Sequence, residues 1–521
     1  MRKLIVCEKE YDSVRITAGE SAPEQYACGQ LQKYLEKAGL RTGDGMEIKL
    51  QTDSAIDRDG YRICVCDCGG ISICGGNGRG VIYGVYAFLE KYAGMRFFMP
   101  GLESLGEGDI VVNEGWSFTP PFEMRQSDWQ CGNSDVDWCV KNGVNHRVIP
   151  REMGGHVKYG GFVHTMESLV GVPQNQQPCL SDPAVLEKAK ASVRRILEKD
   201  PDVTIVSVSQ NDNYNYCKCE KCAAVDAEEG SHAGTLLRFV NAVAADIAED
   251  YPHVVIDTLA YQYTRNVPSI TKPLPNVCIR LCSIECCFSH PLNDRTCPEN
   301  DKFFNDILDW NKICDRIYIW DYVTDFSYYI PTFPNFGVLR ENMRFFAEHG
   351  VRGMYPEGNY NSPASGEFGE LRCYLLAKLM MDPYMSTVEY YRHMDEFLAA
   401  YYGEGWRYIR AYIDYTCAEA AGGHMKIWDG PFSIIPRDKY EAMEETIELW
   451  WNKAEELAGD RLDAVKRSRF QWRYIRLMLH PDAEEGKRFR EEVDAAEVKW
   501  NEWRKLPDEV DYSRTPDKWF E

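Results

Sequence analysis

TIVSVSQND, residues 204–212, is the first of four short apolar runs in the middle of the chain that each end on a carboxylate. The others are VCIRLCSIE at 277–285, RIYIWD at 316–321 and VRGMYPE at 351–357. Continuous apolar runs of this length are typical of strands buried on both faces in a parallel sheet. A (β/α)8 barrel builds its active site at the C-terminal ends of such strands. The pattern therefore predicts a carboxylate-driven barrel enzyme, and sugar hydrolases are its most obvious users.

The rest of this region supports a parallel sheet. From about residue 116 to 385, strand-like runs alternate with amphipathic helical segments, which is the signature of βα units. The expected strands are 122–127, 144–149, 161–164, 204–209, 254–260, 277–284, 316–320 and 353–355. We therefore expect an α/β fold with a (β/α)8, TIM-like barrel over residues 116–385.

Two further regions flank the predicted barrel. Residues 1–115 carry short strands and two helical patterns, which indicate a small α/β domain. Residues 386–521 are helical in pattern and rich in Trp and Tyr. We expect three parts in all, the last being a helical C-terminal region.

The net charge and the aromatic content of the chain limit which classes of partner it is expected to bind. The 521 residues carry a net charge of −22, which argues against nucleic acid and anionic membranes. Thirteen Trp and 31 Tyr offer flat faces on which sugars stack, although most large aromatic side chains fill cores. No signal peptide or membrane span is visible, so we expect a cytoplasmic protein whose 20 cysteines are mostly reduced. We expect a carbohydrate substrate and no cofactor; the sequence leaves the oligomeric state open.

Glu285 and Glu357 are the candidate catalytic carboxylates. Glu357 follows a strand and precedes Gly358, where the chain opens into the rim. Glu285 follows an apolar strand and precedes CCFSHPL, so we expect it to be poorly solvated and suited to general acid catalysis. Alternatively, Glu357 caps its loop, and Glu285 forms a structural ion pair with Arg280 or another arginine.

Polar and aromatic side chains at the other strand ends are candidate substrate ligands. They are suited to hydrogen bonding with hydroxyl or acetamido groups and to stacking on sugar rings. Asn and Asp are also ordinary turn residues, and a lone His is more often structural. The candidates are His164, Gln210, Asp212, Tyr261, Tyr263, Trp320, Asp321 and Asn359.

Cys217, Cys219 and Cys222 form the densest local cysteine pattern. Three thiolates at this spacing suit zinc, with a fourth ligand such as Cys131 or His232. A complete zinc site usually shows a second cysteine pair, and none is obvious. We therefore expect reduced structural thiols and no metal, with zinc or a disulfide as the alternatives.

Several of these segments together resemble a known family. IVSVSQNDNYNYCKCEKC, DTLAYQYT, IRLCSIECCFSHPL, IYIWDYVTDFSYYIPTFPNFGVL and VRGMYPEGNY are similar to the DUF4838 family, which overlaps glycoside hydrolase family 163. Upstream, GRGVIYGVYAFLEKYAGMRFFMPG resembles the end of the small domain that precedes the barrel in family 20 hexosaminidases and α-glucuronidases.

The resemblance implies a retaining β-N-acetylglucosaminidase-like glycosidase that cleaves glycans containing N-acetylglucosamine. In related hexosaminidases the substrate's own acetamido oxygen attacks the anomeric carbon, one carboxylate orients that group, and a second protonates the leaving oxygen. Glu285 as the acid and Glu357 as its partner is our leading assignment. Two alternatives are a uronide-directed glycosidase, with Arg280, Arg352 and Arg372 as basic candidates, and an inactive carbohydrate-binding protein.

Overall fold

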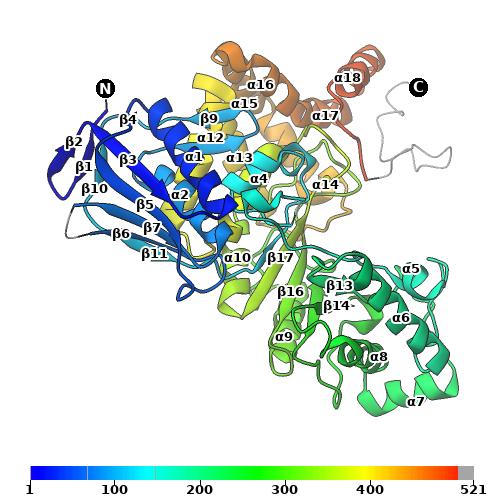
Figure 1. The fold of residues 1–521 in the computed structure, drawn as a ribbon. Helices are drawn as coiled ribbons and strands as arrows, with labels where there is room; N and C mark the ends of the chain where they lie inside the picture. The colour runs from blue at the N-terminus through cyan, green and yellow to red at the C-terminus, as the bar shows by residue number, and fades with distance from the viewer. Residues whose placement is uncertain (1, 67–68, 147, 503–521) are drawn as a thin grey trace. The chain divides into compact units, whose positions relative to one another are not determined.

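The chain forms two compact units in the computed structural model, which describes residues 2–66, 69–146 and 148–502 (Figure 1). The first unit consists of Met1–His156, Thr324–Arg340 and Gly358–Glu521, and the second of Val157–Val323 and Glu341–Glu357. The chain therefore passes between the units several times. The division into residues 1–115, 116–385 and 386–521 stays a prediction.

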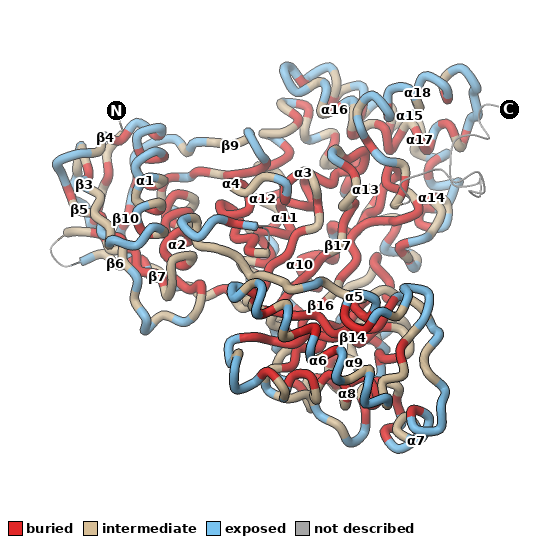
Figure 2. The backbone as a smooth tube through the Cα atoms, turned by 45° about the vertical axis from the view of Figure 1, so that its right-hand side comes forward, coloured by how far each residue is buried: buried red, intermediate tan, exposed pale blue. Residues whose placement is uncertain are grey.

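Five parallel strands of a curled sheet form the centre of the second unit. They are hydrogen-bonded in the chain order β13, β14, β15, β16 and β17. The strands are β13 (Ile205–Ser207), β14 (Val255–Ala260), β15 (Val277–Cys282), β16 (Ile317–Tyr322) and β17 (Val351–Glu357). Every residue of β13, β14 and β15 is buried (Figure 2), which explains why most of their side chains are apolar; the buried Asp257 of β14 and Arg280 of β15 pair with each other.

Helices lie between β13 and β14, between β15 and β16 and between β16 and β17, as the alternation in the sequence predicts, whereas β14 and β15 are joined by a segment with one short helical turn, Gln262–Thr264. The helix α8 packs on β14 and β15, and α6 packs on α8. Asp182 and Ser231 cap the N-termini of α6 and α8 by accepting a backbone N–H with their side chains. The helices of this unit include α5 (Met166–Val170), α6 (Pro183–Lys199), α7 (Glu220–Glu229), α8 (His232–Ile247) and α9 (Pro298–Asn311), and α10 (Leu339–Glu348) begins at its boundary with the first unit.

The α/β class and the parallel sheet are confirmed, but the sheet is half of a barrel. Residues 161–164 form no strand, because Gly161, Val163 and His164 have positive φ angles that no strand can accommodate. The described residues of 144–149 form no strand either; residue 147 lies outside them. Of 122–127 only β12 (Met124–Arg125) is extended, and it belongs to the first unit.

The first unit contains a six-stranded sheet with two helices packed on it. The strand order is β11-β6-β7-β5-β3-β4, and α1 and α2 pack against its strands and each other. The elements are β3 (Ser13–Ala18), α1 (Ala22–Lys37), β4 (Arg41–Thr42), β5 (Met46–Thr52), β6 (Tyr61–Val65), β7 (Ile71–Gly75), α2 (Gly78–Lys91) and β11 (Trp116–Phe118). A second sheet has the order β10-β1-β2, with β1 (Leu4–Val6), β2 (Lys9–Tyr11) and β10 (Ile110–Val112). Strands β8 (Arg96–Met99) and β9 (Leu102–Ser104) pair separately.

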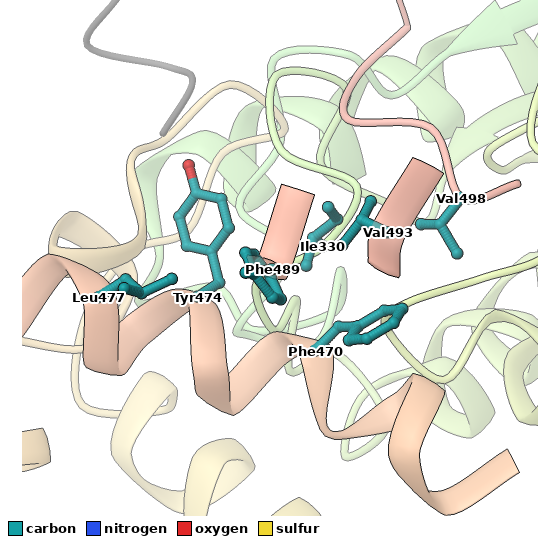
Figure 3. Packing of buried hydrophobic residues seen from close by; sticks show 7 residues of the cluster. All are labelled: Ile330, Phe470, Tyr474, Leu477, Phe489, Val493 and Val498. Carbon is teal, nitrogen blue, oxygen red and sulfur yellow. The ribbon is translucent and has the colours of Figure 1, made fainter. Parts of the chain in front are cut away.

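The C-terminal part of the first unit is helical, as predicted. A hydrophobic cluster joins α17 and α18 to Ile330 and Val498 (Figure 3). None of the helices that the structure describes combines the length and the apolar character that a bilayer crossing requires. The main helices are α11 (Gly369–Met381), α12 (Thr387–Tyr402), α13 (Trp406–Ala420), α15 (Arg437–Glu456), α16 (Leu462–Ser468), α17 (Phe470–Leu479) and α18 (Ala483–Ala495).

Candidate functional site

Aromatic side chains line one face of the sheet at the C-terminal ends of β16 and β17. Successive residues of a strand point to opposite faces, so the strand register decides which side chains share a face. The register places Trp320 beside Tyr355, and Tyr322 beside Glu357. The ring of Trp320 lies 4.6 Å from that of Tyr355 and stacks on Phe162 at 5.8 Å. We call Phe162, Trp320, Tyr322 and Tyr355 the aromatic wall.

Glu357 is the carboxylate at the aromatic wall. It is the last residue of β17 and is partly exposed. The indole Nε1 of Trp320 donates a hydrogen bond of 2.7 Å to its Oε2. Burial raises the pKa of Tyr322 well above its ordinary value, and the thiol of Cys282 and the charge of Glu357 raise it further. The Tyr322 hydroxyl therefore stays neutral beside Glu357, and it is hydrogen-bonded to the thiol of Cys282.

Glu285 lies outside the sheet and differs from its expected environment. Its side chain is 48% exposed and pairs with Arg265, which is 4% exposed. The predicted apolar surroundings are therefore wrong, because the chain has left β15 three residues earlier. The alternative of an ion pair is confirmed, with Arg265 rather than Arg280 as the partner. Arg265 also contacts Asp306 at 2.6 Å.

Cys282 is a buried thiol at the end of β15. Burial raises the pKa of this thiol to about 12; the positive charge of Arg280 lowers it, the negative charge of Glu357 raises it, and the positive charge of Arg265 lowers it.

The hydroxyl of Tyr261, which follows β14, lies beside the carboxylate of Asp212, which follows β13. The exposed Asp212 accepts a hydrogen bond of 3.1 Å from Gln262 Nε2. Burial raises the pKa of the Tyr261 hydroxyl, and the charge of Asp212 raises it further. Tyr261 is therefore a neutral donor next to an acceptor. Gln210 is buried and donates to Thr264 Oγ1 at 2.7 Å, which fixes this part of the rim. Tyr263 packs against Tyr216 farther along.

Two residues near Asp212 and Tyr261 have a strained backbone conformation. His164 and Gln262 each have a φ of 52°, a left-handed conformation that residues other than glycine seldom adopt. His164 Nδ1 lies 2.8 Å from the carbonyl oxygen of Gln210. Such strain costs about 1–3 kcal/mol per residue and concentrates at functional sites. The strain therefore favours a functional role for this rim.

Two of the predicted substrate ligands, Asp321 and Asn359, do not lie with the other candidates. Asp321 points to the face opposite Trp320, is 2% exposed and accepts a hydrogen bond of 2.7 Å from Ser283 Oγ. Burial raises its pKa to about 6. Asn359 is buried and belongs to the first unit. The structure does not bring Asp321 together with Glu357.

Two of the three candidate basic residues, Arg280 and Arg372, are engaged in buried ion pairs. Arg280 is fully buried and pairs with Asp257 at 3.0 Å, deeper along the same face as Cys282. Arg372 belongs to the first unit and pairs with the buried Glu367 at 2.5 Å. Neither arginine presents an open basic subsite for a uronate.

The cysteine cluster has a fourth member that sequence spacing did not indicate. The thiol that lies with Cys217, Cys219 and Cys222 is that of Cys179. The expected fourth members are wrong: Cys131 belongs to the first unit, and His232 Nδ1 lies 2.6 Å from Asp226 Oδ2.

Sequence reasoning also missed Phe162 and Tyr355 of the aromatic wall. The signal for Tyr355 was present, because Tyr355 is two residues from Glu357. A period of two places such pairs on one face of a strand. Phe162 lies in an irregular segment and carried no comparable signal.

Comparisons with known proteins place the chain in a family and among known folds. Residues 107–414, more than half of the chain, match the family described as Domain of unknown function (DUF4838). No curated protein matches the sequence.

Two solved structures are similar over almost the whole chain. A GH115 4-O-methyl-α-glucuronidase with specificity for decorated arabinogalactans has a TM-score of 0.57 at 11% identity, covering 98% of this chain and 79% of that one. A GH138 enzyme targeting pectin rhamnogalacturonan II has a TM-score of 0.53 at 9% identity, covering 98% of this chain and 78% of that one. At these identities the similarity concerns the fold.

Proposed function

The chain belongs to the DUF4838 family, and we propose that it is a glycoside hydrolase whose active site is centred on Glu357. One observation carries the proposal: the carboxylate of Glu357 lies at the C-terminal end of a parallel strand and accepts a hydrogen bond from Trp320 of the aromatic wall. Barrel enzymes place catalytic groups at this end of their strands. The similar folds of two carbohydrate-active enzymes agree with this class.

Glu357 is suited to protonate the leaving oxygen. Its Oε2 accepts from the Trp320 indole, which fixes the orientation of the carboxyl group, and the protonated form can donate to a glycosidic oxygen. Flat rings next to it offer stacking surfaces for sugars, as aromatic side chains do at carbohydrate subsites. General acid catalysis of this kind contributes roughly 10²- to 10⁴-fold to the rate.

Glu285 is the second catalytic carboxylate in this proposal. Its ion pair with the buried Arg265 holds it in place as an anion. An anion near the anomeric carbon stabilises the positive charge that develops in the oxocarbenium-like transition state. This proposal reverses the sequence-based assignment: Glu357 is the acid, and Glu285 is its partner.

An N-acetylated sugar is the substrate that the pair of Asp212 and Tyr261 supports best. An acetamido group has one N–H donor and one carbonyl acceptor. Asp212 can accept from the N–H, while the neutral hydroxyl of Tyr261 donates to the carbonyl. A group held this way is positioned for substrate-assisted attack on the anomeric carbon, with retention of configuration.

A glycan panel with mass-spectrometric product analysis tests the proposal. It contains oligosaccharides with terminal and internal N-acetylglucosamine, and uronides as the comparison class. We expect wild type to release N-acetylglucosamine-containing products and Glu357→Gln and Glu285→Gln to lose most of that activity. Asp321→Asn is the matched control, because this carboxylate points to the opposite face of β16.

Three results would contradict the proposal. Full activity in both glutamine variants would remove the two carboxylates from the mechanism. Turnover of uronides alone would favour the uronide-directed alternative. Glycan binding on an array without any turnover would indicate a carbohydrate-binding protein.

A further inference from the structure

Four cysteine thiols of the second unit lie together where two loops meet. Cys219 caps the N-terminus of α7, Cys222 lies in its first turn, and Cys217 precedes it. Cys179 comes from the other loop. The four Sγ atoms all lie within 4.8 Å of one another. The Sγ of Cys179 is 3.7 Å from that of Cys219 and 3.8 Å from that of Cys222.

These distances distinguish between the chemical states of the thiols. A disulfide needs about 2.05 Å between its sulfur atoms. A tetrahedral zinc ion with Zn–S bonds of about 2.3 Å places its sulfur ligands about 3.8 Å apart. We propose that Cys179, Cys217, Cys219 and Cys222 bind one zinc ion in a closed, four-coordinate structural site. The ion replaces the four thiol protons, which pass to solvent.

The surroundings of the cluster suit its charge. Four thiolates and one Zn²⁺ carry two net negative charges. The run CKCEKC places Lys218, Glu220 and Lys221 between the three cysteines, which gives a net charge of +1, and all three residues are exposed. The backbone N–H of Cys222 donates to Cys219 Sγ at 3.5 Å, at the positive end of the α7 dipole. The cations and the helix end therefore offset part of the negative charge.

The site lies at the end of a hydrogen-bonded seam between the two loops. Gln177 Nε2 donates to the carbonyl oxygens of Asn211 and Asn213, at 2.6 and 3.0 Å. Asn211 Nδ2 donates back to the carbonyl of Gln176 at 2.9 Å, and Asn215 Nδ2 to that of Asn175 at 2.9 Å. A zinc ion bound by Cys179 and the three later cysteines links the same two loops through coordinate bonds. It therefore holds the loop that carries Asp212.

Metal analysis of the full-length, untagged protein tests the site. After purification without chelator, and again after reconstitution with ZnCl₂, we expect about one zinc per chain by mass spectrometry. Cys179→Ser and Cys217→Ser should lose most of it, and Cys7→Ser, at an exposed cysteine of the first unit, should retain it. Circular dichroism of each variant verifies folding.

Wild type alone provides a second test that requires no variant to fold. Alkylation with peptide mapping should modify the four thiols only after a chelator is added. Cobalt-substituted protein should show thiolate-to-cobalt charge-transfer bands. Absence of zinc after reconstitution, iron in its place, a disulfide among these cysteines, or equal zinc loss in Cys7→Ser would overturn the proposal.

Discussion

Replacing Asp321 by Asn should change how the stability of the protein depends on pH. Burial raises the pKa of this carboxyl from 3.8 to about 6 in the folded protein. The folded state therefore holds the proton more tightly than the unfolded state, and stability falls as the pH rises through this range. The cost is about 1.6 kcal/mol at pH 5 and about 3 kcal/mol at pH 8. Asparagine does not ionise and does not incur this cost.

The free energy of unfolding of wild type and variant, measured by urea titration at both pH values, gives the test. Relative to wild type, Asp321→Asn should gain about 1.4 kcal/mol on going from pH 5 to pH 8. The exposed Asp315→Asn, just before β16, should show little pH-dependent difference. An Asp321→Asn difference that is the same at both pH values, or that falls as the pH rises, would refute the reasoning.

The other predictions concern contacts around the rim. Trp320→Phe removes the hydrogen bond to Glu357 and should lower kcat roughly 10- to 100-fold; unchanged kinetics would show that the contact is not used. Tyr261→Phe should raise KM roughly 10-fold for an N-acetylated substrate but not for its 2-hydroxy analogue, and equal effects on both would contradict a contact with the acetamido group. Cys179→Ser should lower the melting temperature by roughly 5 °C or more, whereas a shift no larger than that of Cys7→Ser in differential scanning fluorimetry would argue against a structural metal.

The parallel strands were predictable because burial on both faces leaves a direct trace in the sequence. Residues 254–260 were expected to be extended, and β14 spans Val255–Ala260. Residues 161–164 failed because their apolar side chains lie in a segment with left-handed backbone, which composition does not reveal. Local apolarity indicates burial, and a strand also requires extended dihedral angles.

The candidate site was predictable only in part. Glu357 and Trp320 were found because each lies at the end of an apolar run. The exposure of Glu285 depends on where the chain leaves β15, which no residue in the run marks. Cys179 comes 40 residues before Cys219, so only the fold brings their thiols together. Trp320 and Asp321 are adjacent, so strand alternation already implied opposite faces.

The leaving-group dependence of Glu357→Gln tests the central claim most directly. If Glu357 protonates the leaving oxygen, the variant should lose roughly 10²- to 10⁴-fold of kcat/KM on oligosaccharides. It should lose much less on a nitrophenyl glycoside of the same sugar, because nitrophenolate departs without a proton. Equal losses on both substrates, or this pattern in Glu285→Gln instead, would contradict a site in which Glu357 is the acid.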